Sequence, residues 1–129
     1  MSEPPEGYLG AGSRIRRGPA PELVEAGFAL ELADAPLLHR GFGLADLAHA
    51  IVLGEGGVIP AADLRALLGA LLDLLDGDVP ADASYGDLAN VRERQLTQRI
   101  GGPSGWLNAG RPRREAGRIA FRLALRARV

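Results

Sequence analysis

Apolar residues recur at the spacing of an α-helix through most of this sequence. The clearest example lies between residues 60 and 76, where Pro60 suits the first turn of a helix and Gly77 suits its end. Its leucines fall three or four residues apart on one face: Leu64, Leu67, Leu68, Leu71 and Leu75. The same period predicts helices over residues 21–33, 44–53, 85–100 and 113–129. Because the alternation typical of β-strands is nearly absent, we predict an all-α fold.

Glycine and proline mark the boundaries between these helices. They are dense in residues 1–20, which we expect to form an irregular arm, and we expect residues 21–129 to form one small helical domain. Gly41 and Gly43 interrupt the helical spacing of apolar residues just before the predicted helix over residues 44–53. The run of glycines and proline at 101–103 interrupts the chain before a loop that extends to residue 114. The aspartates just beyond residue 72 lack the spacing of an EF-hand loop, so we expect a solvated acidic turn there.

Charge is unevenly distributed, although the formal net charge is only -1. All 15 basic residues are arginines, and they gather after residue 87, whereas most acidic residues lie between residues 18 and 87. A chain without lysine cannot form a Schiff base or a P-loop. A chain without cysteine has no disulfides, thiolate nucleophiles or sulfur-ligated zinc. With no secretory signal and no membrane-length apolar segment, we expect a soluble, cytoplasmic protein with no membrane partner.

The two histidines give little support to catalysis or metal binding. His49 lies on or beside an apolar helix face, where a hydrogen-bonded structural role is more common than that of a base. His39 and His49 lack a neighbouring acidic pair, so we expect no metal and no cofactor.

The arginine-rich loop is the strongest chemical signal in the composition. Arg111, Arg113 and Arg114 lie where a glycine loop meets a predicted helix N-terminus, which favours anion binding. They could equally be surface arginines that pair with the acidic half, within the chain or across an oligomer interface. Nucleic acid is a third option, because Trp106 and Phe121 offer stacking. Two observations argue against nucleic acid: the final arginines share their helix with core leucines, and the whole chain is not basic.

Three motifs in register indicate a known family. Residues 87–96 (DLANVRERQL) match a segment that reads roughly D-[IV]-H-x-x-x-E-x-R-L, and residues 106–115 (WLNAGRPRRE) match K-L-H-T-G-R-S-R-N-D. Upstream, residues 47–59 (LAHAIVLGEGGVI) match I-A-H-A-x-x-L-x-x-x-G-I-I. In this order and spacing the chain resembles the argininosuccinate lyases, from about Gly7 to its end.

The resemblance implies a fold and a chemistry. The fold would be the small, mostly helical N-terminal domain of the fumarase/aspartase superfamily, truncated before the central helical bundle. Members are homotetramers whose active sites take residues from three subunits. They eliminate an amine from a succinyl group and release fumarate, through a doubly charged carboxylate intermediate that needs electrostatic stabilisation. The implied substrate-binding residues are Gly110, through its backbone, and three arginines: Arg111, Arg113 and Arg114.

Several positions depart from the family pattern. Arg114 replaces the substrate-contacting asparagine, Ala109 a threonine, Ala89 a histidine, and Leu30 a substrate-binding serine. We therefore expect a succinyl-type or other dicarboxylate substrate that need not be argininosuccinate. The family's catalytic serine loop would lie beyond residue 129, so we assign no catalytic residue to this chain.

Three accounts of function remain open. The chain is the small subunit of a split lyase that binds a larger lyase-like chain or forms a homo-oligomer, and is inactive alone. Alternatively it is a non-catalytic, truncated lyase domain with an interaction role. The third and least favoured account is an arginine-rich module that binds nucleic acid. The last helix carries Phe121, Leu123 and Leu125 up to an uncapped end, which favours association through an apolar surface.

Overall fold

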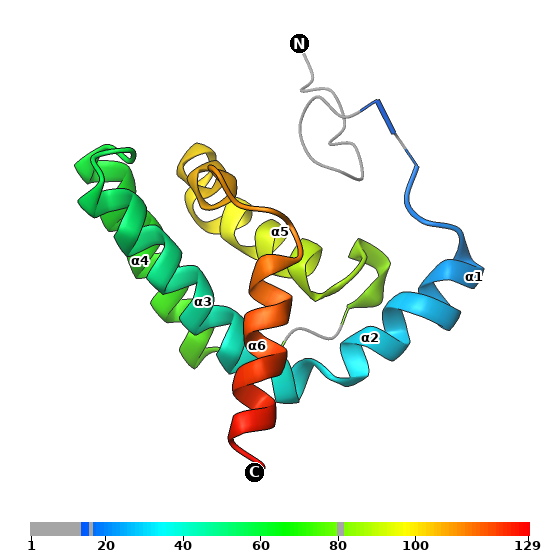
Figure 1. The fold of residues 1–129 in the computed structure, drawn as a ribbon. Coiled ribbons are helices and arrows are strands. Elements are labelled where there is room, and N and C mark those ends of the chain that lie inside the picture. The colour runs from blue at the N-terminus through cyan, green and yellow to red at the C-terminus, as the bar shows by residue number, and fades with distance from the viewer. Residues whose placement is uncertain (1–13, 16, 80–81) are drawn as a thin grey trace.

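The computed structural model describes residues 14, 15, 17–79 and 82–129, and these residues contain helices and no strand (Figure 1). The all-α prediction is confirmed. In chain order the elements are α1 (Pro21–Leu23), the π-helical η1 (Val24–Phe28), α2 (Ala29–Ala33), α3 (Ala35–Glu55), α4 (Ala61–Asp76), the 3₁₀ turn η2 (Ala83–Tyr85), α5 (Leu88–Ile100), the 3₁₀ helix η3 (Gly102–Asn108) and α6 (Glu115–Arg126).

The long helix α3 is the centre of the fold. It forms a hairpin with α4, which runs back along it, and α6 crosses it near its N-terminal half (Figure 1). Two apolar clusters lie along α3. One joins α3 to α2, α5 and α6 and contains Leu32, Ala35, Phe42, Ala45, Leu88, Val91, Ala116 and Ala120. The other joins α3 to α4, α5 and η3 and contains Ala50, Ile59, Leu67, Ala70, Leu71, Leu74, Leu96 and Leu107.

The predicted helix over residues 21–33 forms, but it packs little. The segments α1, η1 and α2 follow one another as one rod that extends away from the α3–α4 hairpin (Figure 1). Leu23 and Leu30, which carry its apolar period, are exposed, and Leu32 alone among its residues is buried. Periodicity therefore identified the helix but not the face that packs.

Other boundaries differ from the prediction by a few residues. The fourth predicted helix begins at Leu88 rather than residue 85, because the Asp87 side chain accepts a hydrogen bond from the Asn90 N–H at 2.9 Å and caps α5 there. The glycine-rich break after α5 continues as η3, in which Trp106 Nε1–H donates to Asp63 Oδ2 at 2.8 Å and so ties η3 to α4. Asp73, Asp76, Asp78 and Asp82 are exposed, as expected of a solvated acidic segment, although the first two lie in the last turn of α4 and only the others follow it.

Gly41 and Gly43 lie inside the continuous helix α3 rather than at a break. A Cβ on Gly41 would lie 2.6 Å from the Ala120 Cα, and one on Gly43 would lie 2.6 Å from Leu75 Cδ1. At Gly41 the contact is with backbone, so glycine is needed for the close crossing of α6, whereas at Gly43 the contact is with the flexible end of a leucine side chain. Neither glycine forms a turn. The helix-weakening cost of glycine, about 1 kcal/mol relative to alanine, is offset by this packing.

Replacing Gly41 tests this crossing. We expect Gly41→Ala to lower the free energy of unfolding by about 1–3 kcal/mol, because the new methyl group overpacks the α3–α6 contact. The matched control is Gly69→Ala in α4, where a Cβ would meet nothing within 4 Å. That variant should be neutral or slightly more stable. Urea denaturation followed by circular dichroism measures both, and equal effects of the two substitutions would contradict the close crossing.

Candidate functional site

The loop that precedes α6 carries the arginines singled out in the sequence. Gly110 has φ 62°, a left-handed conformation that glycine adopts without strain. Just before it, the Ala109 carbonyl accepts a hydrogen bond from His49 Nε2–H at 3.1 Å, so α3 holds the start of the loop. The predicted structural role of His49 is confirmed by this contact.

A buried carboxylate on α3 fixes the next residue of the loop. Arg111 Nη1–H donates to Asp46 Oδ1 at 2.7 Å, and Arg92 Nη2–H from α5 donates to the other oxygen, Oδ2, at 2.9 Å. The three side chains are 6%, 5% and 2% exposed for Arg111, Asp46 and Arg92. We call these three residues the Asp46 cluster. It joins α3, α5 and the loop before α6 at one point in the core.

Two further groups complete the surroundings of the Asp46 cluster. Arg92 Nη1–H donates to His39 Nδ1 at 3.3 Å, and the Arg92 guanidinium lies 5.8 Å from the centre of the Phe42 ring. Burial, followed by the charge of Arg92, lowers the pKa of His39 from its usual value. Glu115, at the start of α6, lies 3.6 Å from Arg111 Nε and adds a half-exposed negative charge.

Sequence reasoning missed Asp46 and Arg92, although one signal was present. Arg92 occupies the position between Leu88 and Leu96 on the apolar stripe of α5, four residues from each. An arginine there must be buried, and a buried guanidinium requires an acidic partner. The partner, Asp46, is 46 residues away and cannot be identified from local spacing.

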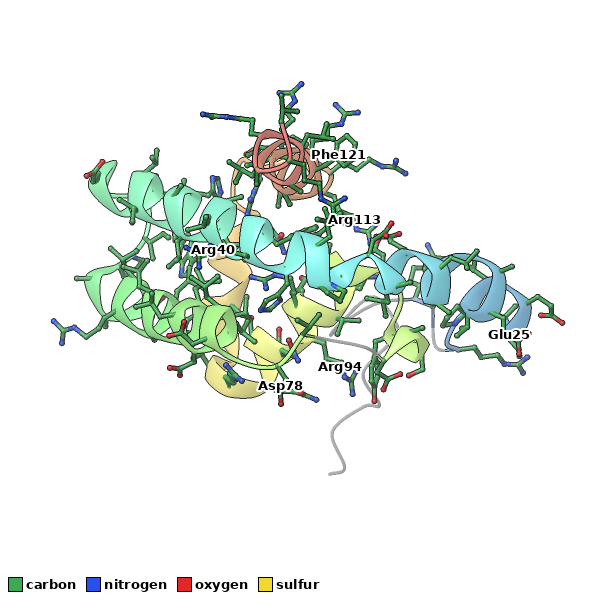
Figure 2. The ribbon with its side chains drawn as sticks, turned by 90° about the horizontal axis from the view of Figure 1, so that it is seen from below. Glu25, Arg40, Asp78, Arg94, Arg113 and Phe121 are labelled. Carbon is green, nitrogen blue, oxygen red and sulfur yellow. The ribbon has the colours of Figure 1, made fainter. Side chains whose placement is uncertain are left out.

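Outside the core, a groove opens between the loop, α6, α5 and α2. Its volume is about 330 Å³, and its lining is mixed: Phe42, Ala89, Gly117 and Phe121 are apolar or small, and Glu31, Asp87, Arg113, Arg114 and Arg118 are charged. Arg113 Nη2–H donates to Asp87 Oδ2 at 2.6 Å and to Asn90 Oδ1 at 2.7 Å. Arg113 lies beneath α6 and Phe121 beside it (Figure 2).

The charges of the groove influence one another. Desolvation, followed by the nearby Asp87 carboxylate, raises the pKa of Glu31, while Arg113 and Arg114 oppose that rise. The groove therefore presents both cationic and anionic groups to a ligand. Arg113 is 58% exposed despite its ion pair, so part of its guanidinium is accessible to solvent.

The four residues expected to bind substrate are thus divided between two environments. Arg113 and Arg114 line the groove, whereas Arg111 is buried against Asp46. Arg111 and Arg113 both line a second, small cavity of about 60 Å³. Gly110 precedes them in an exposed turn. Pairing with the acidic half, one of the open interpretations of these arginines, is observed for Arg111 and Arg113.

The chain is similar in sequence to argininosuccinate lyases from several organisms. The chain is 36% identical over 87 residues, 64% of its length, to an argininosuccinate lyase of Geobacillus thermodenitrificans. It is 36% identical over 90 residues (67% of the chain) to that of Methanoculleus marisnigri, and 36% identical over 123 residues (89%) to that of Corynebacterium jeikeium. The chain is a relative of argininosuccinate lyase. It spans only 19%, 18% and 24% of the length of these three proteins. No family model and no solved structure matches it.

The structure shows what two of the three motifs do locally. Residues 47–59 supply His49, which holds Ala109, and residues 87–96 supply Asp87 and Asn90, which hold Arg113. Both motifs therefore support the arginine loop of the third. Within the described residues, no group of histidines and carboxylates could hold a metal ion, and no helix is long and apolar enough to cross a membrane.

Removing the charge of Asp46 should destabilise the whole domain. We expect Asp46→Asn to lower the free energy of unfolding by about 3–5 kcal/mol, because two buried guanidinium groups lose their shared counterion. Asp76→Asn is the control, since Asp76 is exposed at the end of α4, and it should change stability by less than about 0.5 kcal/mol. Chemical denaturation measures both. A small effect at Asp46 would show that the cluster is not a required core contact.

The stability of the domain should also depend on pH through His39. Its pKa is lowered in the folded chain, so the unfolded chain binds the proton more tightly. The free energy of unfolding is therefore highest above the pKa of His39 in the unfolded chain, about 6.5, and decreases as the pH falls toward its pKa in the folded chain. His39→Gln should therefore flatten the dependence of unfolding free energy on pH below about 6.5. A wild-type slope retained in His39→Gln would exclude His39 as the titrating group.

Proposed function

We propose that this chain forms part of the substrate-binding site of an argininosuccinate lyase-like enzyme. In such a reaction a base removes a proton from the carbon beside a carboxylate, the neighbouring C–N bond breaks, the amine leaves, and fumarate is released. The role proposed for this chain is to bind a carboxylate of a succinyl-type substrate. The other catalytic groups are supplied by a larger lyase-like chain or by another copy.

The observation that carries the proposal is the groove beside α6. It is concave, it is large enough for a small dicarboxylate, and it is lined by Arg113 and Arg114, which come from the family-like loop. A partly desolvated guanidinium binds a carboxylate with two parallel hydrogen bonds and stabilises additional negative charge as it develops. These properties match the needs of a doubly charged intermediate.

The loop arginines have different roles in this proposal. The Arg111 guanidinium is paired with Asp46 in the core. Substrate binding by Arg111 stays a prediction, and in this proposal Arg111 holds the loop in place instead of contacting the carboxylate. Arg113 is oriented by Asp87 and Asn90 and remains largely exposed. Arg114 is exposed at the N-terminal end of α6. We therefore propose Arg113 and Arg114 as the direct ligands, with the Gly110 backbone approaching the substrate.

The need for a partner follows from the groups present in the groove. Its titratable side chains are Glu31, Asp87 and three arginines, Arg113, Arg114 and Arg118. The family resemblance attributes the catalytic base to a serine loop that does not correspond to any part of these 129 residues. The partner would complete the groove, and a cytoplasmic location is part of the same proposal.

Departures from the family motifs favour a second candidate. Arg114, Ala109, Ala89 and Leu30 stand where the resemblance expects polar residues that contact substrate. A lyase-derived domain that keeps the fold but not the catalysis would tolerate these changes. In that case the groove has no selective affinity for a dicarboxylate.

Ligand titration distinguishes the two candidates. We expect succinate to shift the NMR resonances of Arg113, Arg114 and their neighbours, with binding weakened about ten- to a hundredfold by Arg113→Lys, which loses the planar fork of donors. Arg65→Lys, on an exposed position of α4, is the control. Arg111→Lys should lower the melting temperature. Equal, mild effects of all three substitutions on succinate binding would favour the non-catalytic candidate.

The same chain provides an activity control. Incubated alone with argininosuccinate, it should release no fumarate, as followed by ultraviolet absorbance. Turnover that is abolished by a substitution within these 129 residues would contradict the proposed need for a partner.

A further inference from the structure

The side of α6 that faces away from α3 has an unusual composition. Arg118, Arg122 and Arg126 are spaced four residues apart and are all exposed. Phe121 and Leu125 lie beside them and are 54% and 48% exposed. We call these five residues the α6 outer face. Arginine side chains extend from α6 into solvent on this side of the molecule (Figure 2).

The inner side of α6 explains why this outer face is left uncovered. Ala116 and Ala120 are buried against α3, and the close crossing at Gly41 holds the helix there. The five residues of the outer face lie outside this contact and are exposed, whereas Ile119 packs against the core beside it. The outer face is thus a fixed surface on a helix of 12 residues, about 18 Å long.

The charges of the outer face have no counterions in the part of the chain that the structure describes. Like charges four residues apart on a helix are destabilising, by about 0.2–0.5 kcal/mol for each pair. The carboxylate at the start of α6, Glu115, lies against Arg111 instead. The side chains of Arg118, Arg122 and Arg126 form no hydrogen bond or ion pair with another described residue. A partner that supplies acidic groups would remove the repulsion among them.

We propose that the α6 outer face binds an acidic, amphipathic α-helix of a partner protein. Acidic side chains one turn apart on that helix would match the one-turn spacing of Arg118, Arg122 and Arg126. Apolar residues on its adjacent face would cover Phe121 and Leu125. Arginine beside exposed aromatic and aliphatic side chains is the composition typical of the centre of a protein interface.

A protein helix fits this surface better than a nucleic acid does. A phosphate backbone would neutralise the arginines but would leave Leu125 uncovered. Phe121 is the only aromatic residue on α6, whereas single-stranded nucleic acids are generally bound on several stacking side chains. Trp106, the other aromatic residue of this half, is partly buried and packs in the core with its N–H on Asp63. The inference rests on α6 alone and does not require the groove to bind a substrate.

Fluorescence anisotropy with the 129-residue chain tests the proposal. The probe is a labelled synthetic helical peptide with glutamate at every fourth position and leucine on the adjacent face. We expect saturable binding that weakens about tenfold in Arg122→Ala/Arg126→Ala, because two interfacial ion pairs are lost. These two residues lie outside the groove. Arg65→Ala/Arg99→Ala removes the same charge from exposed positions on α4 and α5, and it should change binding by less than about twofold.

Two further measurements separate this proposal from simple attraction of polyanions. Leu125→Ala should weaken binding even at high salt, where ion pairs are screened. A scrambled peptide of the same composition, or a single-stranded oligonucleotide, should bind more weakly than the helical peptide. Circular dichroism should show that Arg122→Ala/Arg126→Ala is at least as stable as wild type, because repulsion is relieved. Equal binding of the scrambled peptide or the oligonucleotide, or equal loss in the control double variant, would overturn the proposal.

Discussion

The Asp46 carboxylate holds α3, α5 and the loop before α6 together. Its two oxygens accept one hydrogen bond each from Arg92 and Arg111, so a single side chain on α3 positions both α5 and the loop before α6. All three groups are almost fully buried. In such surroundings an ion pair contributes little net stability over an apolar contact, but breaking it leaves an uncompensated charge and is strongly unfavourable. The Asp46 cluster therefore holds the loop in one conformation, because any conformation that separates Arg111 from Asp46 leaves a buried charge without a partner.

The same contact divides the roles of the loop arginines. Because Arg111 is held in the core, Arg113, two residues further on, meets Asp87 and Asn90 at the edge of the groove. Arg114 follows at the start of α6, on the same groove. The loop thus has a buried side, held by Asp46, and a side that lines the groove.

The packing of α6 connects the core to the outer surface. Gly41 allows α6 to approach α3 so closely that Ala120 lies directly against it. On the other side of α6, Arg118 and Phe121 line the groove, and Arg122, Leu125 and Arg126 are exposed beyond it. The proposed carboxylate site and the proposed docking face are therefore neighbouring surfaces of one helix. They share Arg118 and Phe121, so the test variants are placed where the two surfaces do not overlap, at Arg113 for the groove and at Arg122 and Arg126 for the outer face.

The sequence by itself determined the all-helical fold, the extent of α4, the hydrogen-bonded state of His49 and the position of the arginine loop before the last helix. These features depend on local spacing and short motifs, which can be read along the chain. The first nine residues of α3 and the Asp87 cap of α5 were missed. Only the tertiary structure decided that the helix over residues 21–33 is largely exposed, that Gly41 marks a helix crossing, and that Arg111 turns inward while Arg113 faces the groove. The reason is distance along the chain. Asp46 and Arg111 are 65 residues apart, and the helical period of one segment carries no information about which charge on another will lie opposite it.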